Sequence, residues 1–185
     1  MARSGPQPGA NDKGQAMLTW VNSTGGPLIC GESAGLAAWK GISGSSEGDG
    51  TQTDYERACK TTAYLEAITV GGAKALILGD EPMQSTFVAA AANKLRIARW
   101  IAAPSREAAE ALLRGPDTGL VEAGSPVEFD IAGQELYMFD SSAPWIQGKT
   151  EAAVSLVQPG AYIVTTEKLT SPATVAFIIH RFLPR

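Results

Sequence analysis

The stretch from Leu65 to Pro82 constrains the fold more than any other part of the chain. It contains two apolar runs, 65–70 and 73–78, which are separated by Gly71-Gly72. A tight turn between two strands needs positive φ angles, which glycine adopts at low cost. The second run ends in Gly-Asp-Glu-Pro, a turn signal that carries two carboxylates. The stretch therefore predicts a β-hairpin that ends in an acidic turn.

A second stretch, 127–139, has a similar pattern and predicts a second hairpin. In this comparison Gly133 corresponds to Gly72, and Asp140 corresponds to Asp80. Two similar hairpin units indicate an internal duplication, although chance similarity between hairpins would give the same pattern.

The remaining chain reads mostly as strands with short connections. We expect a helix over 104–114, capped by Ser105, and short helices that begin near Ser33 and Thr53. The segment 86–92 fits either a helix or a strand. Further strands are expected at 17–21, 28–30, 95–103, 151–157, 161–166 and 174–182, with 151–157 and 161–166 paired across the Pro159-Gly160 turn. The predicted fold class is α+β, sheet-rich and antiparallel, with two or three short helices.

Length and charge restrict the organisation and the partners. A chain of 185 residues favours one domain. We expect residues 1–16 to form a disordered tail and residues 17–185 a single domain, with a flexible Gly/Ser-rich loop at 41–53. The net charge of −4 argues against nucleic acid as a partner.

The chain shows neither a secretory signal nor an apolar run long enough to cross a membrane. These features predict a cytoplasmic protein without membrane contact. Its two cysteines, Cys30 and Cys59, are then expected to be reduced, because a disulfide is disfavoured in that compartment. One histidine and two cysteines without metal-ligand spacing predict neither a metal site nor a cofactor.

One catalytic pattern stands out. Residues 31–35, Gly-Glu-Ser-Ala-Gly, match the nucleophile elbow of serine hydrolases, and Asp130 or Asp140 and then His180 follow in the order of a catalytic triad. The position of the motif disfavours this interpretation, since a hydrolase fold places several strands before the elbow and only 30 residues precede Gly31. A small serine hydrolase that uses Ser33 with His180 is therefore the alternative hypothesis.

Seven short segments, taken together, carry a family resemblance. They are 20–29 (WVNSTGGPLI), 39–41 (WKG), 54–59 (DYERAC), 75–82 (ALILGDEP), 99–100 (RW), 139–141 (FDS) and 159–162 (PGAY). Their order resembles the immunity protein 21 family of bacterial polymorphic toxin systems, over roughly residues 18–183. The resemblance implies a small cytoplasmic protein, not an enzyme, that binds the toxin encoded beside it and protects the producing cell. The 41–53 loop is long for this pattern.

A toxin-binding protein needs a contact surface, and five residues beside turns are candidates. Trp39 and Trp145 could anchor a partner, because tryptophan is enriched at binding hot spots, although both could equally be core residues. The turn carboxylates Asp80, Glu81 and Asp140 could meet basic groups of a toxin. The alternative for these carboxylates is that they only cap turns through hydrogen bonds to the backbone.

Overall fold

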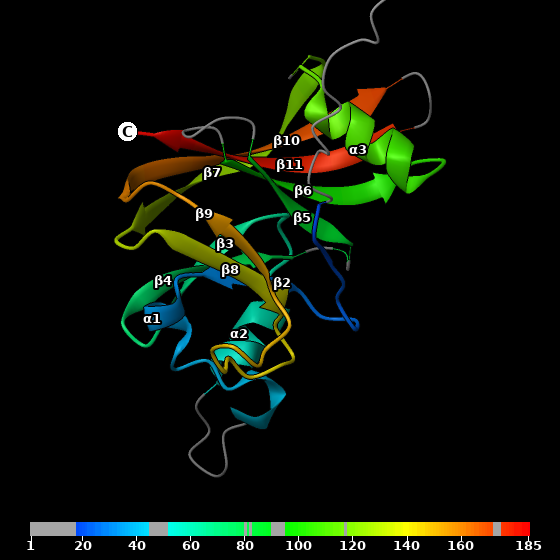
Figure 1. Ribbon diagram of the computed structural model, residues 1–185. Coiled ribbons are helices and arrows are strands. Elements are labelled where there is room, and N and C mark those ends of the chain that lie inside the picture. Colours follow the sequence, from blue (N-terminus) through cyan, green and yellow to red (C-terminus); the bar gives the residue numbers. More distant parts are fainter. Residues whose placement is uncertain are drawn as a thin grey trace, which may run out of the picture.

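The computed structural model describes residues 18–44, 52–79, 81, 83–89, 95–116, 118–171 and 175–185. These residues form two antiparallel β-sheets that pack face to face, with short helices on the outer faces (Figure 1). The antiparallel, sheet-rich α+β fold expected from the sequence is confirmed. The predicted tail 1–16, most of the 41–53 loop and Asp80 lie outside the described residues.

The larger sheet has six strands and contains both the longest strands and the C-terminal end of the chain. It lies in the upper half of Figure 1. Its strand order is β1 (Trp20–Val21), β5 (Ser85–Ala89), β6 (Leu95–Ala102), β11 (Val175–Pro184), β10 (Gly160–Ser171) and β7 (Leu120–Ile131). The ambiguous segment that begins at 86 is therefore a strand as far as Ala89.

The smaller sheet has five strands and lies below the first in Figure 1. Its order is β3 (Glu66–Val70), β4 (Ala73–Leu78), β2 (Leu28–Gly31), β8 (Glu135–Asp140) and β9 (Ala153–Leu156). The hairpin predicted at 65–78 is confirmed, because β3 pairs with β4 up to Val70 and Ala73. Gly71 and Gly72 form its turn with φ angles of 56° and 87°.

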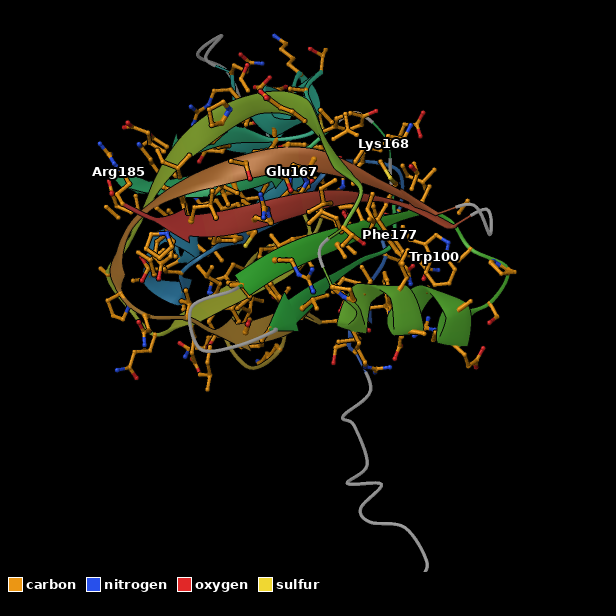
Figure 2. All side chains as sticks on the ribbon, turned by 90° about the horizontal axis from the view of Figure 1, so that it is seen from above. Trp100, Glu167, Lys168, Phe177 and Arg185 are labelled. Atoms are coloured by element: carbon orange, nitrogen blue, oxygen red, sulfur yellow. The ribbon has the colours of Figure 1, made fainter. Side chains whose placement is uncertain are left out.

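Short helices cover the outer faces of the two sheets. Helix α3 (Arg106–Arg114) begins at Ser105, whose side chain accepts a hydrogen bond from the Ala108 amide at 3.2 Å, as the sequence predicts. It covers the six-stranded sheet, where Trp100 and Phe177 lie beside it with ring centroids 6.2 Å apart (Figure 2). The other face of the molecule carries α1 (Ser33–Leu36), the 3₁₀ helix η1 (Gly41–Gly44) and α2 (Asp54–Cys59).

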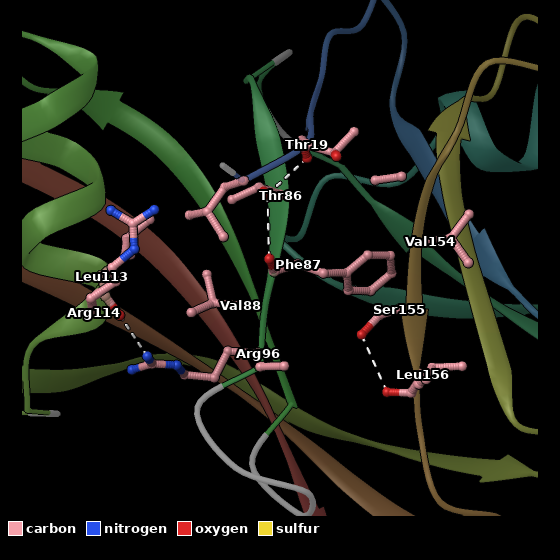
Figure 3. Close-up of a pocket in the computed structure, with 13 residues that line it drawn as sticks. Thr19, Thr86, Phe87, Val88, Arg96, Leu113, Arg114, Val154, Ser155 and Leu156 are labelled. Atoms are coloured by element: carbon pink, nitrogen blue, oxygen red, sulfur yellow. Dashed lines mark hydrogen bonds between the residues drawn. The ribbon is translucent and has the colours of Figure 1, made fainter. Parts of the chain in front are cut away.

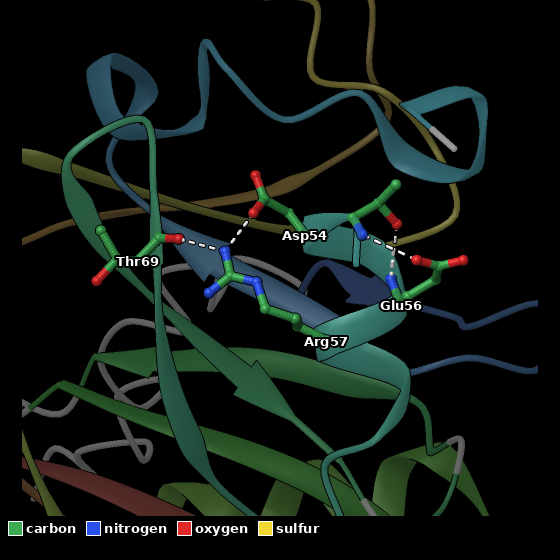
Figure 4. Close-up of polar contacts among 5 residues, drawn as sticks. Asp54, Glu56, Arg57 and Thr69 are labelled. Carbon is green, nitrogen blue, oxygen red and sulfur yellow. Dashed lines mark hydrogen bonds and ion pairs between the residues drawn. The ribbon is translucent and has the colours of Figure 1, made fainter. Parts of the chain in front are cut away.

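Local side-chain chemistry defines the start and the position of α2. Thr53 and Glu56 form a capping box, in which each side chain accepts a hydrogen bond from the other residue's backbone amide (Figure 4). One guanidinium nitrogen of Arg57 donates both to the Asp54 carboxylate and, at 2.8 Å, to the Thr69 carbonyl of β3. The helix is thereby fixed to the edge of the five-stranded sheet.

Three apolar layers stabilise this arrangement. The central layer lies between the two sheets, and an outer layer lies on each far face. The central layer includes Phe87, Phe129, Leu136, Met138 and Phe182. Each sheet is therefore buried on both faces over much of its area, which explains the nearly continuous apolar runs in strands such as β4.

The second predicted hairpin, 127–139, is wrong. Strand β7 pairs with β10 in the larger sheet, whereas β8 pairs with β2 and β9 in the smaller one. Phe129 of β7 and Leu136 of β8 both belong to the central layer, to which the two sheets contribute from opposite sides. Alternating apolar residues fit this corner as well as they fit a hairpin. The internal duplication stays a prediction.

The pairing expected between 151–157 and 161–166 is also wrong. Both segments are strands, but β9 pairs with β8, whereas β10 pairs with β7 and β11. The Pro159-Gly160 turn carries the chain from one sheet to the other. The predicted strand at 17–21 is limited to the two residues of β1.

Candidate partner-binding groove

A groove of about 650 Å³ lies where the edges of the two sheets meet (Figure 3). One wall is formed by β5 together with Leu18 and Thr19, and the other wall is formed by β9. The Phe87 side chain extends from β5 toward Ser155 across the space between the walls. The groove therefore places elements of both sheets within reach of one extended ligand.

The wall formed by β5 is paired over only part of its length. Strand β1 pairs with Ser85 and Thr86, and the Thr86 hydroxyl donates to the Thr19 carbonyl at 2.8 Å. Among the described residues, no strand pairs with this edge of β5 from Phe87 to Ala89. Within the described part of the chain, the short β1 thus leaves the backbone from Phe87 to Ala89 without a partner strand on this edge, although Phe87 and Val88 are themselves buried.

The wall formed by β9 is a terminal strand with apolar side chains on its exposed face. Its Ala153 and Ser155 side chains are buried, whereas Val154 is 50% exposed and Leu156 is 75% exposed. Leu156 has the largest exposed fraction of the described large hydrophobic side chains. Exposed apolar side chains on an open strand edge are a common feature of recognition surfaces.

The charged side chains that line the groove are both arginines. Arg96 donates to the Leu113 carbonyl at 2.7 Å, and Arg114 forms an ion pair with Glu110 at 2.7 Å. Burial, followed by repulsion from Arg181, lowers the pKa of Arg96 from its usual value. Arg96 is buried, so Arg114, which is 30% exposed and paired with Glu110, is the charged lining side chain that a ligand in the groove could reach.

The two tryptophans expected to contact a partner are both buried. Trp39 is 1% exposed, and its indole nitrogen donates to the carbonyls of Ser141 at 3.0 Å and Ala143 at 3.1 Å. Trp145 is 8% exposed and packs against Tyr137, with ring centroids 4.8 Å apart. In the free protein both side chains belong to the outer apolar layer of the smaller sheet, which leaves little of either for a partner.

Asp140 caps the turn that follows β8. Its carboxylate accepts hydrogen bonds from the Thr24 amide at 2.7 Å, the Thr24 hydroxyl at 2.6 Å and the Ser142 amide at 2.9 Å. Desolvation is the largest single influence and raises the pKa of Asp140, but the hydrogen bonds together outweigh it and hold the pKa below its usual value. The carboxylate also lines a second groove of about 560 Å³, together with Trp20 and Ile146.

Of the two predicted acidic residues that the structure describes, Glu81 is exposed and Asp140 is partly exposed. Its backbone is held by the buried Arg99, whose guanidinium donates to the carbonyls of Tyr64 at 2.9 Å, Gly79 at 2.7 Å and Glu81 at 2.7 Å. The acidic turn after β4 is thus fixed to the larger sheet. The five residues expected at one surface are distributed between the core, two turns and, for Asp80, a position that is not described.

The structure does not bring Ser33 and His180 together. Ser33 begins α1 on the outer face of the smaller sheet, whereas His180 belongs to β11 of the larger sheet and is 0% exposed. The His180 Nδ1 atom lies 3.0 Å from the Thr166 hydroxyl. Burial, followed by the nearby charge of Arg99, lowers the pKa of His180 well below its usual value. Glu32, the residue before Ser33 in the motif, has a structural role, because its carboxylate accepts hydrogen bonds from the backbone amides of Ala132 and Gly133.

The described residues give no indication of metal chemistry or of a disulfide. No group of three or more His, Cys, Asp and Glu side chains in the described part of the chain is placed to hold a metal ion. Cys30 is a buried free thiol, whose pKa is raised by burial, and Cys59 is an exposed free thiol. No helix in the described ranges has the length and apolar character needed to cross a membrane.

Sequence reasoning missed the groove, although part of its signal was present. The segment 151–157 was expected to be a strand, but its alternating letters would bury the larger Val154 and Leu156, whereas the structure buries Ala153 and Ser155. Its neighbours could not be read from the sequence, and the incorrect pairing with 161–166 concealed which of its edges is free.

Comparison with known proteins gives one match. The family model described as immunity protein 21 matches residues 19–174, which is most of the chain. Neither the curated proteins nor the solved structures provide a significant match.

Proposed function

The chain belongs to the immunity protein 21 family, and on that basis we propose that it binds and neutralises a cognate toxin of a bacterial polymorphic toxin system. The match over residues 19–174 is the observation that carries the proposal, since it spans β1 to the end of β10. Neutralisation would take place in the cytoplasm of the producing cell, before the toxin is exported.

The proposed mechanism is stoichiometric binding without chemistry. Protection of the producing cell requires slow dissociation more than fast encounter, because a toxin molecule that is released even briefly can act. A standard interface of roughly 1,600 Å² with a few central anchors is sufficient for tight binding. The separation of Ser33 from His180 by the smaller sheet gives no support to the hydrolase alternative.

Some of the contact residues proposed from the sequence remain available for this role. The exposure of Glu81 and the partial exposure of Asp140 support a role for these two carboxylates in contacting a basic toxin surface, and Asp80 adjoins Glu81 in the chain. Trp39 and Trp145 would act through the core that they support, by holding the turn after Asp140 in place.

Co-expression with the toxin domain encoded beside the gene tests the proposal. We expect this protein to restore growth and to form a one-to-one complex with the toxin domain by calorimetry. A non-cognate immunity protein of another family is the control and should leave the toxin active. Growth arrest despite soluble expression, together with no detectable heat of binding, would remove the proposed function.

A further inference from the structure

The outer edge of β9 presents free backbone hydrogen-bonding groups. The Val157 amide donates at 2.9 Å to the carbonyl of Gln134, the residue before β8, and this bond fixes which residue pairs of the ladder are hydrogen-bonded. In an antiparallel ladder, residues whose backbone amide and carbonyl point toward the partner strand alternate with residues whose backbone groups point away from it. The backbone groups of Ala153 and Ser155, like the Val157 amide, therefore point toward β8. The amides and carbonyls of Val154 and Leu156 therefore point away from β8. The Ser155 hydroxyl reaches the Leu156 carbonyl at 3.3 Å, and no strand pairs with this edge among the described residues.

This edge lacks the protection that another terminal strand of the molecule has. Strand β7, at one end of the larger sheet, carries Glu122, Pro126, Glu128 and Asp130 in exposed positions. Charged residues and proline on an edge strand oppose pairing with another chain. Strand β9 has neither, since its sequence is Ala-Val-Ser-Leu. The contrast indicates an edge that is kept open for pairing.

The groove supplies the remaining contacts that an added strand needs. It offers about 650 Å³ beside this edge, with the Phe87 ring between the walls (Figure 3). Arg114, whose side chain is 30% exposed, lies at the far side, on α3. Backbone pairing gives affinity in strand addition, and pockets for alternate side chains give specificity.

We propose that β9 receives an extended segment of the cognate toxin, which pairs with the backbone of Val154 and Leu156 and lies in the groove. This inference rests on the proposed function and names the surface and the binding mode. The segment presents apolar side chains at alternate positions, which contact the exposed side chains of Val154 and Leu156. It carries a carboxylate at the end near Arg114, where it shares with Glu110 the partly exposed guanidinium of that arginine.

A second copy of this chain fits the edge less well. Pairing of β9 with β9 would involve four residues, a length of about 13 Å, and so short a ladder alone buries too little area for a stable dimer, whereas a toxin segment would also occupy the groove. The chain's own residues 1–17, which precede Leu18 at the groove, have a glycine- and proline-rich sequence that is unsuited to a strand.

Amide hydrogen exchange by NMR tests the pairing directly in the unmodified protein. The Val154 and Leu156 amides should exchange rapidly in the free protein and become at least about tenfold slower in the co-purified complex with the toxin domain. The Val157 amide is the internal control, since its hydrogen bond to Gln134 protects it in both states. Complex formation without added protection of Val154 and Leu156 would overturn the inference and leave the proposed function intact.

A backbone variant provides the second test. Val154→Pro removes an outward amide without removing a bond to β8, and it should weaken toxin binding by about tenfold or more. Val154→Thr keeps the amide and the branched side chain, and it should bind within about fivefold of the unmodified protein. Arg114→Gln should reduce the salt dependence of the affinity. Equal affinities and salt dependence for all these proteins would refute the strand addition.

The same measurements distinguish the other occupants. A dimer of the free protein that Val154→Pro converts to a monomer would assign the edge to a second copy. Faster exchange of the Val154 amide after deletion of residues 1–16 would assign it to the protein's own N-terminal segment. Either result would overturn the proposal, whereas absence of any complex with the toxin domain would instead remove the proposed function.

Discussion

Replacement of Gly71 by alanine, compared with the same change at Gly72, measures how closely the β3–β4 turn packs against Ala38, which follows α1. Both glycines have positive φ angles, 56° and 87°, so alanine is strained at either position. They differ in their surroundings. A Cβ atom on Gly71 would lie 2.7 Å from the Cβ atom of Ala38, whereas a Cβ atom on Gly72 would meet nothing within 4 Å.

The expected magnitudes follow from this difference. Alanine in a left-handed conformation costs about 1–2 kcal/mol, and the reduced freedom of the unfolded chain offsets about 0.4–1 kcal/mol of that cost. Gly72→Ala should therefore lower the free energy of unfolding by about 1 kcal/mol. Gly71→Ala adds a steric overlap, for which overpacking costs are about 1–3 kcal/mol, so its total loss should be about 2–4 kcal/mol.

Urea denaturation of both variants gives the two free energies of unfolding. A double-mutant cycle then isolates the overlap, because Ala38→Gly removes the atom that the new methyl group meets. We expect a favourable coupling of about 1–3 kcal/mol between Gly71→Ala and Ala38→Gly, and none between Gly72→Ala and Ala38→Gly. Equal losses at both glycines, with no coupling to Ala38, would refute the close approach of the turn to Ala38.

Two further predictions concern the buried polar groups of the larger sheet. The pKa of His180 is lowered in the folded state, so the unfolded chain binds its proton first as the pH falls. The stability contribution should be fully present above about pH 6.5, and the free energy of unfolding should fall by up to about 1.4 kcal/mol per pH unit below that value. Urea denaturation between about pH 7.5 and 5 measures this slope, which His180→Gln should reduce. Arg99→Met deprives three carbonyls of their donor and should lower the free energy of unfolding by about 3–5 kcal/mol, with a smaller decrease for Arg99→Lys. An unchanged midpoint of thermal unfolding for Arg99→Met would contradict the role of this side chain in holding the backbone of Gly79 and Glu81.

The sequence by itself determined the elements whose causes are local. Gly71-Gly72 specified the β3–β4 hairpin, because only a turn with positive φ angles connects those two runs so tightly. Ser105 and the following alanine-rich segment specified α3 in the same way. The sheet-rich antiparallel class followed from the number of such elements and their short connections. The order of seven short sequence segments pointed to the immunity protein 21 family, whose family model matches residues 19–174.

The tertiary structure alone decided which strands are neighbours and which side chains are covered. Strand β9 was expected as a strand, but its free edge became visible only when β8 proved to be its partner. Trp39 and Asp140 lie next to turns in the sequence, yet both are hydrogen-bonded within the fold. The Trp39 indole nitrogen donates to the Ser141 carbonyl, and the Asp140 carboxylate accepts from the Thr24 amide. An alternating pattern fixes only which face of a strand is buried. Its neighbours in the sheet are chosen by contacts between residues far apart in the chain, which no local pattern records.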